Sequence, residues 1–400
     1  MVSCTHGLRV LILTIYGALA VILLWFYSNS NIAELSNRFI QVISVKNDFV
    51  FDQYYMTNST YQNYCVYENV IKPTVVDYNR ISQIVHMSSN LLDIRLVEQI
   101  LNWNAPFTVS IFLNEVNDYG CVLNTLNALL SAYPVCLKYL TVHIVFPNHW
   151  SPNCFLLPNT TCNEVSKSLR VQQMAAYPAN VMRNIARMYS SSKYILIADL
   201  EHMFSANFEE DVRHIADRVL SNDPKRLLVY RIFEVEQNIS SLPHDKKDLF
   251  ELFKNGQAVV FHERYYKGAH NIDNLGSWFQ MKKQERGISV SNYGYSMSSW
   301  EPQFVSLSSI PYHDENFPFL IRDNTELRWE LCRAGYAIDI LSDHFVYHRG
   351  IKTALSAGVI PRQIQAINTR KFQNALEKFN ERMAKSYPQT NDKCPTFQAK

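Results

Sequence analysis

The sequence predicts an α/β fold with a mixed, mostly parallel central sheet, preceded by one transmembrane helix. Segments of strand length alternate with segments of helical periodicity after Pro73, as in a sheet built from β-α units. The 400 residues are 47% hydrophobic and only 18% charged, so the chain can bury a large core. An uncharged apolar run near the N-terminus supplies the transmembrane prediction.

This apolar run covers residues 10–27 and would form a helix about 27 Å long, close to the thickness of a bilayer core. The alternative, a cleaved signal peptide, usually has a shorter apolar part of about 7–15 residues. Arg9 precedes the run and the next basic residue is Arg38, which indicates a cytoplasmic tail at residues 1–9. We therefore expect a single-pass type II signal anchor in the Golgi or ER membrane, with the rest of the chain lumenal.

Three glycosylation sequons, at Asn58, Asn159 and Asn238, agree with a lumenal glycoprotein. The formal net charge of +2 gives no electrostatic reason to expect a nucleic-acid partner.

Eight cysteines occur, and seven of them follow the predicted anchor, where an oxidising lumen favours disulfides. Their spacing does not resemble a zinc site. Cys154 and Cys162 bracket a short segment, so a small disulfide loop between them is one plausible pairing. Because seven is odd, at least one of these thiols is free or pairs between chains.

The domain boundaries are predicted from changes in polarity and periodicity along the chain. Residues 28–72 are polar and lack periodicity, which suggests a lumenal stem, and residues 73–385 form the globular domain, followed by a tail at 386–400. Within the domain, strands are expected within 74–88, 106–114 and 139–147 and up to Asp199, and helices at 91–103, 124–133, after Pro178 and at 362–387.

Two carboxylates mark the end of one expected strand. In "YILIADLEHMF" the apolar run ends at Asp199, and Glu201 follows after one residue. In extended chain, side chains two positions apart point the same way, so these acids repel each other unless a divalent cation lies between them. The alternative is a solvated or arginine-paired couple of acids at a strand end. In open α/β sheets the carboxyl edge of the strands is where ligands bind.

Several motifs, in a fixed order, now point to one family. They are "YPANVMRNIA", "ADLEHMF", "RIFEVE", "YHDENF" and "FVYHRG". In this respect the chain resembles the family-49 glycosyltransferases, the group that contains the LARGE-type glucuronyltransferase domain and β-1,4-glucuronyltransferase. The similarity spans about residues 73–352.

The resemblance implies a GT-A-like fold and an Mn²⁺-dependent, inverting transfer of a sugar from a UDP-sugar to a glycan or glycoprotein acceptor. It implies that Asp199, Glu201 and His348 hold the metal. It further implies donor contacts from Arg183 and Asn184. For Arg183, a helix-surface arginine paired with an acid is the alternative.

By motif position, Asp323 is the expected catalytic base and Glu326 the reserve. The alternative for this couple is an ordinary helix N-cap at Asp323 with Glu326 completing a capping box.

The sequence leaves the donor sugar open between glucuronate and N-acetylglucosamine, and it leaves open whether the protein forms homo- or hetero-oligomers. The family pattern has Gly-x-Gly before the position of Asp323, where this chain reads "PFLIRDN". The alternative function is therefore a catalytically impaired pseudoglycosyltransferase that binds a glycan or a partner enzyme.

Overall fold

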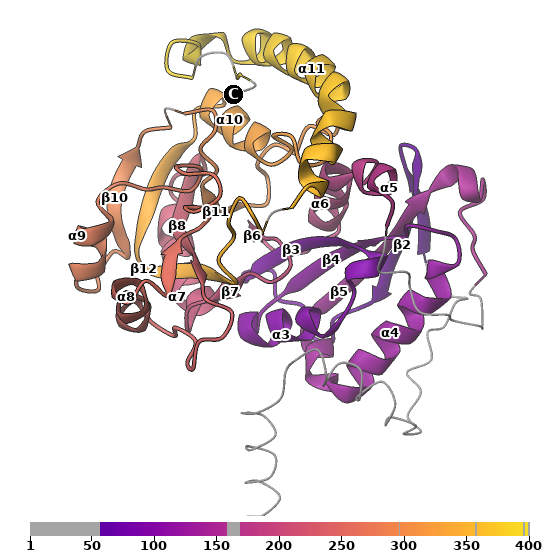
Figure 1. The fold of residues 1–400 in the computed structure, drawn as a ribbon, viewed down its shortest axis with the longest axis horizontal. Coiled ribbons are helices and arrows are strands. Elements are labelled where there is room, and N and C mark those ends of the chain that lie inside the picture. Colours follow the sequence, from indigo (N-terminus) through magenta and orange to yellow (C-terminus); the bar gives the residue numbers. More distant parts are fainter. Residues whose placement is uncertain (1–56, 158–168, 296, 357, 395–396, 399–400) are drawn as a thin grey trace, which may run out of the picture. The chain divides into compact units, whose positions relative to one another are not determined.

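A computed structural model of the chain describes residues 57–157, 169–295, 297–356, 358–394 and 397–398 (Figure 1). The expected tail at 1–9 and anchor at 10–27 lie outside these ranges. Among the residues that are described, no helix is both long and apolar enough to cross a bilayer.

The core of the molecule is one sheet, which has 12 strands in the described part of the chain. Its hydrogen-bonded order is β1-β2-β5-β4-β3-β6-β11-β8-β12-β10, with β7 beside β12 and β9 beside β8. The strands are β1 (Thr57–Tyr61), β2 (Tyr64–Ile71), β3 (Ile81–Ser88), β4 (Phe107–Phe112), β5 (Leu140–Pro147), β6 (Tyr194–Ile197), β7 (Met203–Phe204), β8 (Arg226–Val235), β9 (Ala258–Val260), β10 (Ile288–Tyr293), β11 (Gln303–Leu307) and β12 (Ala337–Arg349).

The central block β5-β4-β3-β6 is parallel throughout, as the sequence predicted. β8 and β12 form a second parallel pair, and β11 joins the two blocks by pairing antiparallel with both β6 and β8. The sheet is therefore mixed, with a parallel centre that has antiparallel strands on both sides.

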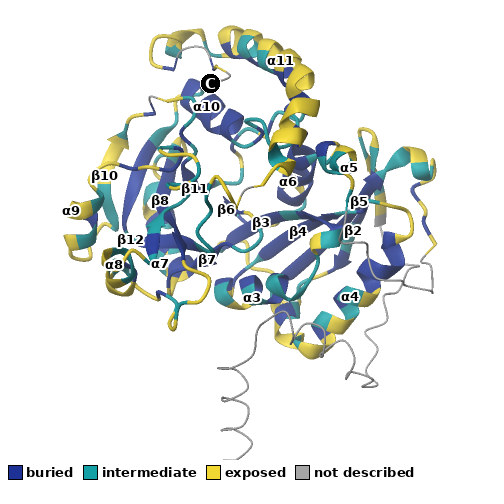
Figure 2. Cartoon of the chain, in the orientation of Figure 1, coloured by how far each residue is buried: buried dark blue, intermediate teal, exposed yellow. Residues whose placement is uncertain are grey.

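Helices cover the sheet on both faces. In Figure 1, α3 and α4 lie on one side of the central block and α5 and α6 on the other. The helices are α3 (Ile94–Trp103), α4 (Asp118–Ala132), α5 (Val171–Ala175), α6 (Ala179–Met188), α7 (Phe208–Val219), α8 (Lys246–Lys254), α9 (Leu275–Gln280), α10 (Thr325–Arg333) and α11 (Ile360–Ser386). Figure 2 shows that the strands of the centre are almost entirely buried between these layers.

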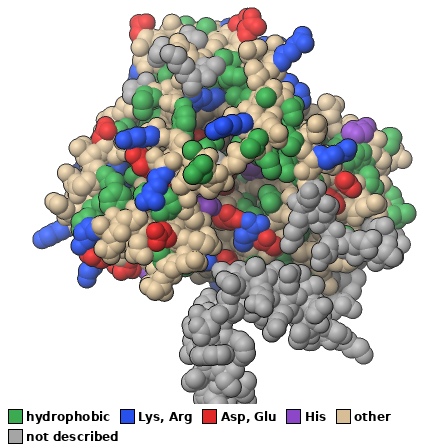
Figure 3. Space-filling view, viewed as in Figure 1, with side chains coloured by type: hydrophobic (Ala, Val, Ile, Leu, Met, Phe, Trp, Pro, Cys, Tyr) green, Lys and Arg blue, Asp and Glu red, His purple; other side chains and the backbone are tan. Residues whose placement is uncertain are grey.

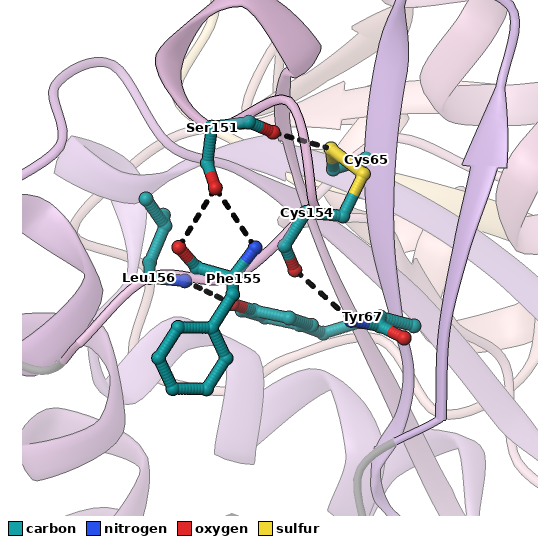
Figure 4. The surroundings of a disulfide bond; sticks show 7 residues. Cys65, Tyr67, Ser151, Cys154, Phe155 and Leu156 are labelled. Atoms are coloured by element: carbon teal, nitrogen blue, oxygen red, sulfur yellow. Dashed lines mark hydrogen bonds between the residues drawn. A yellow bond between two sulfur atoms is a disulfide. The ribbon is translucent and has the colours of Figure 1, made fainter.

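The expected stem extends too far along the chain. Residues 57–71, assigned above to the stem, form the hairpin β1–β2, which pairs antiparallel with β5. A disulfide between Cys65 and Cys154 ties β2 to the loop after β5 (Figure 4). Most of β2 is buried, but its buried residues are consecutive and do not alternate with exposed ones, so the hairpin lacks a strand pattern in sequence and its pairing with β5 decides the structure.

The same disulfide corrects the expected pairing of Cys154 with Cys162. A second disulfide joins Cys332 to Cys394, and Cys136 is a buried free thiol, which is one of the two outcomes expected from seven cysteines after residue 27.

The C-terminal end also differs from the expected tail at 386–400. Cys394 and Phe397 are both 0% exposed and pack in a core cluster with Trp329 of α10 and Phe379 of α11. Hydrophobic burial and the Cys332 disulfide hold this segment, which looks polar in sequence because its apolar residues are few.

Candidate active site

Asp199 and Glu201 lie at the point of the sheet where successive parallel strands stop being added on one side and continue on the other. β3 has its sequence neighbour β4 on one side and β6 on the other, so the carboxyl ends of β3 and β6 form a topological switch point. Asp199 lies two residues after the end of β6 at this edge. Ligands of open α/β sheets bind at such points.

Helix α3 fixes the backbone that carries both acids. The fully buried Gln99 donates from Nε2 to the carbonyl of Asp199 at 3.0 Å and accepts the backbone N–H of Glu201 at 3.1 Å. Glu201 takes a left-handed backbone conformation, with φ of 81°. The chain therefore turns between the acids, and they do not follow the simple two-residue alternation of a strand.

Asp199 is an exposed residue, and many protein atoms nevertheless lie around its carboxylate. This surrounding protein acts to raise the pKa of Asp199, but nearby His202 and Arg183 outweigh it and lower the pKa to about 2. Asp199 is thus a carboxylate throughout the physiological range.

His348, near the end of β12, meets the second acid. Its Nε2 lies 3.0 Å from Glu201 Oε2, so two of the three expected metal ligands are in contact. Carboxylate and imidazole groups suit Mn²⁺ and related ions in type. Nevertheless, among the residues that the structure describes, no group of three or more His, Cys, Asp or Glu side chains is arranged to hold a metal ion.

Arg95 of α3 occupies the other oxygen of Glu201. Its Nη1 donates to Glu201 Oε1, and its remaining guanidinium donors bind Asp93. The side chains of Arg95 and Glu201 are 35% and 33% exposed. The positively charged guanidinium of Arg95 therefore lies where a metal ion bound to Glu201 would also place its charge. Figure 3 shows acidic and basic side chains side by side on one face of the molecule.

Arg183 of α6 lies inside the protein, not on the helix surface. Its Nη1 donates to Asp323 Oδ2 at 2.9 Å and to Asn180 Oδ1 at 2.7 Å, and its side chain is 6% exposed. Burial raises the pKa of Asp323 even though the Arg183 charge acts to lower it. Arg183 thus fixes the position of the expected base, and its burial leaves little surface for a donor.

Glu326 lies too deep to serve as the reserve base. It is 0% exposed and accepts the backbone N–H of Asp314 at 3.1 Å. The capping alternative is not formed either, because α10 begins at Thr325 after Asn324, without a side-chain cap.

Asn184, expected at the donor, instead holds a loop. Its Nδ2 donates to the carbonyl of His313 at 2.9 Å and to Glu315 Oε1 at 2.7 Å. Its Oδ1 accepts the N–H of His313 at 2.9 Å. The side chain therefore joins α6 to the segment after β11.

The segment "PFLIRDN" retains a glycine-like backbone without glycine. Leu320 and Arg322, directly before Asp323, have φ of 65° and 58°. For an L-residue, left-handed backbone costs roughly 1–2 kcal/mol, which glycine would avoid. This chain therefore adopts left-handed backbone at two positions of the segment despite their bulky side chains.

Glu301, before β11, is a site residue that sequence reasoning missed. It is half-buried, its Oε1 accepts a hydrogen bond from Asn324, and burial raises its pKa. Its position beside the residue that follows Asp323 could be found only from the fold.

A cluster of histidines around Phe261 was also missed. The rings of His202, His262, His270 and His348 lie 4.0–6.1 Å from the Phe261 ring centroid. Burial lowers the pKa of His202 to about 4 and that of His262 to about 3, so these rings are neutral at pH 7. They come from separate segments, and no sequence spacing connects them.

Of the predicted sequons, Asn58 and Asn238 are exposed, as an attached glycan requires, and Asn159 lies outside the described residues. Glycosylation at all three stays a prediction.

The mixed sheet is covered by helices on both faces, and Asp199, Glu201 and His348 lie at its switch point. This arrangement is typical of ligand-binding α/β proteins, many of which are enzymes. The chain matches a family model described as glycosyl-transferase for dystroglycan over residues 80–388, and it belongs to that family. It is therefore an enzyme of the glycosyltransferase class.

Individual relatives agree. The chain is 26% identical to beta-1,4-glucuronyltransferase 1 of Mus musculus over 355 residues, covering 83% of this chain and 81% of the relative. It is 23% identical to the xylosyl- and glucuronyltransferase LARGE2 of Homo sapiens over 173 residues, which cover 43% of this chain and 23% of that protein. A solved structure, S. aureus TarS 1–349 in complex with UDP, matches with a TM-score of 0.35 and 13% identity over 78% of this chain and 74% of that one.

Proposed function

We propose that the protein is a lumenal glucuronyltransferase with a GT-A-like fold, which moves glucuronate from UDP-glucuronate to a glycan acceptor with inversion. The observation that carries the proposal is the contact of Glu201 with His348 beside Asp199, at the switch point of a family member whose relatives are named glucuronyltransferases. These names favour glucuronate over N-acetylglucosamine. A Golgi or ER membrane anchor at residues 10–27 belongs to the same proposal.

Asp199, Glu201 and His348 would hold a divalent cation. When bound, such an ion would neutralise charge on the departing diphosphate. The donor types fit, and Glu201 and His348 already touch, but Arg95 would have to leave Glu201 to make room. Asp93, which Arg95 contacts at 2.8 Å, provides a second carboxylate to which the arginine can remain paired.

Removal of the acceptor proton requires a base. We propose Asp323 for this role, with Arg183 as its positioning residue, since the 2.9 Å contact fixes the carboxylate. Glu301 is the second candidate because the residue is more exposed than Asp323 and its carboxylate accepts a hydrogen bond from Asn324, the neighbour of Asp323.

The test uses the full-length chain, because a truncation at residue 73 would remove β1 and β2. Calorimetric titration with UDP, with and without Mn²⁺, is combined with transfer from UDP-glucuronate to a glycan panel. Asp199→Asn and Glu201→Gln should each lower transfer at least about a hundredfold, the effect of losing a preorganised electrostatic contact. Asp77→Asn, at an exposed acid outside the site, is the control.

A folded protein that binds no UDP with any divalent ion would overturn the proposal. That result would favour the alternative, a protein that keeps the fold and binds a glycan or a partner enzyme.

A further inference from the structure

We propose that a cleft beside helix α6 is a second saccharide-binding site, which takes a neutral, hydroxyl-rich oligosaccharide. The hairpin cleft, as we name it, lies between the β1–β2 turn (residues 61–64), α6 and the loop 312–316. Its volume is about 450 Å³, within the range of small-molecule sites.

Aromatic rings supply the first part of the argument. Tyr61, Tyr64 and Tyr312 line the hairpin cleft, and Tyr312 is 50% exposed. The guanidinium of Arg187 lies 4.5 Å from the centroid of the Tyr312 ring, which holds the ring in place. A tyrosine ring offers an apolar face to the C–H groups of a sugar and a hydroxyl to its oxygens.

Amides supply the second part. Gln62, Asn63 and Asn316 are exposed and line the same cleft, and each amide offers both a donor and an acceptor. Sugar hydroxyls also donate and accept at once, so amides match them better than fixed charges do. A lining of rings and amides is therefore chemically suited to a saccharide.

The wall of the hairpin cleft is pre-formed around one carboxylate. Glu315 accepts from Tyr61 Oη at 2.6 Å, from Gln62 Nε2 at 2.5 Å and from Asn184 Nδ2 at 2.7 Å. These contacts join the hairpin, the loop and α6. A ligand would thus meet a surface that needs little ordering on binding.

Charge defines the ligand class. Glu315 is the one acidic residue among those that line the cleft, and the lining contains no lysine or arginine. Uronate or sulfate groups would meet this carboxylate without a compensating cation, which disfavours acidic saccharides. The cleft therefore differs in preference from a site that must bind UDP and glucuronate.

A buried imidazole adds an independent observation. His313 lines the cleft, is 3% exposed, and its Nδ1 has no hydrogen-bond partner within the described part of the chain. A buried polar atom without a partner is costly unless a ligand or water supplies one. The wall of the hairpin cleft therefore includes a residue with an unpaired buried polar atom.

Asp199, Glu201, His348 and Asp323 are not among the residues that line the hairpin cleft. Asn184 lines the cleft, whereas the preceding residue on α6, Arg183, contacts Asp323. The site would thus hold a neutral part of an extended acceptor while the reacting end lies elsewhere. This role in acceptor binding rests on the proposed function, but saccharide binding itself does not.

The test measures binding to the full-length chain by calorimetry, without UDP or metal. The probes are cellohexaose and chitohexaose, which are neutral, and a hexamer of galacturonate, which is acidic. We expect at least one neutral hexamer to bind and the acidic one to bind at least about tenfold more weakly.

Variants locate the binding. Tyr312→Ala and Asn63→Ala should each weaken the neutral hexamer at least about fivefold, the scale of one lost ring or polar contact. Tyr78→Ala removes a 60% exposed ring outside the cleft and should change nothing. Glu315→Gln keeps the side-chain shape and removes its charge. It should therefore reduce the difference in affinity between the acidic and the neutral hexamers. If Glu315 only supported the structure, this difference would not change.

Three results would overturn this proposal. The affinity for the neutral hexamer could be unchanged in both Tyr312→Ala and Asn63→Ala, all probes could bind equally, or no probe could bind. These results leave the UDP titration untouched. Conversely, loss of UDP binding and transfer with intact hexamer binding would overturn the proposed function and leave the hairpin cleft as a saccharide site.

Discussion

Two arginine–carboxylate pairs stand near the same edge of the sheet, and they differ in burial. The side chains of Arg183 and Asp323 are 6% and 11% exposed, and the pair also involves Asn180. Those of Arg95 and Glu201 are 35% and 33% exposed, and Asp93 is a second partner for Arg95. The first pair is largely buried, although part of the Asp323 side chain still reaches the surface, and the second pair is open to solvent.

The difference separates a structural contact from an exchangeable one. A buried charge that loses its partner has no water to replace it, so the Arg183–Asp323 pair must stay intact. Solvent can replace either member of the Arg95–Glu201 pair at little cost. A cation arriving at Glu201 therefore competes with a weak contact, while Asp323 keeps its position.

The largest effect is expected from Arg183→Met. This change leaves the Asp323 carboxylate buried without its partner and should lower the free energy of unfolding by about 3–5 kcal/mol. Urea unfolding monitored by circular dichroism measures it. The double variant with Asp323→Asn should recover part of the loss; a single-variant loss below about 1 kcal/mol would show that the pair is not buried in solution.

The uncharged side chain of Asn184, on the same helix as Arg183, tests whether a buried contact is costly to lose even without a charge. Asn184→Ala leaves the N–H and carbonyl of His313 without their partner, at a cost of about 1–3 kcal/mol. The matched control is Asn316→Ala on the exposed side of the same loop, where a change within about 0.5 kcal/mol is expected. Equal losses at both positions would contradict the assigned role of Asn184.

A buried histidine extends the comparison to pH. Burial lowers the pKa of His143, in β5 against the Tyr189 ring, to about 3. Between that pH and about 6.5 only the unfolded chain protonates this ring, so stability falls as the pH falls through this window.

At pH 5 this one group removes about 2 kcal/mol. Unfolding of the wild type and of His143→Gln, compared at pH 7 and pH 5, measures the difference. The variant should lose less stability than the wild type; parallel losses would mean that His143 titrates normally in the folded state.

The smallest effect on stability is expected at the exposed pair. Arg95→Gln should change the free energy of unfolding by less than about 1 kcal/mol. Because a competing cation is removed from Glu201, Mn²⁺ should bind more tightly than in the wild type, measured by calorimetry. Arg95→Lys keeps a cation and serves as the control. Weaker Mn²⁺ binding in Arg95→Gln would show that Arg95 supports the metal site.

Sequence patterns predicted the parallel centre because its strands and helices carry their own periodicity. The strand before Asp199 and the helix after Pro178 were confirmed as β6 and α6. The hairpin β1–β2 and the antiparallel β11 were not predicted. Their positions depend on pairing with β5, β6 and β8, and pairing over long sequence separation leaves little local signal.

The site shows the same division. The motifs around Asp199 and His348 were visible, and the contact of His348 with Glu201 agrees with their expected proximity. The buried state of Arg183 and Glu326 was not visible, since helical periodicity treats charged positions as the solvent face. Here each polar side chain finds a partner on a distant segment, such as Asp323 for Arg183.

The Cys332–Cys394 disulfide has a consequence for the strand that carries His348. Its two cysteines are 62 residues apart in sequence, and both β12 and α11 lie in the loop of chain that it closes. The core continues past this cross-link, because Phe397 is completely enclosed beside Trp329 and Phe379. A disulfide of this kind restricts the unfolded chain more than the folded one, so reduction would lower the stability of the part of the sheet on which the site depends.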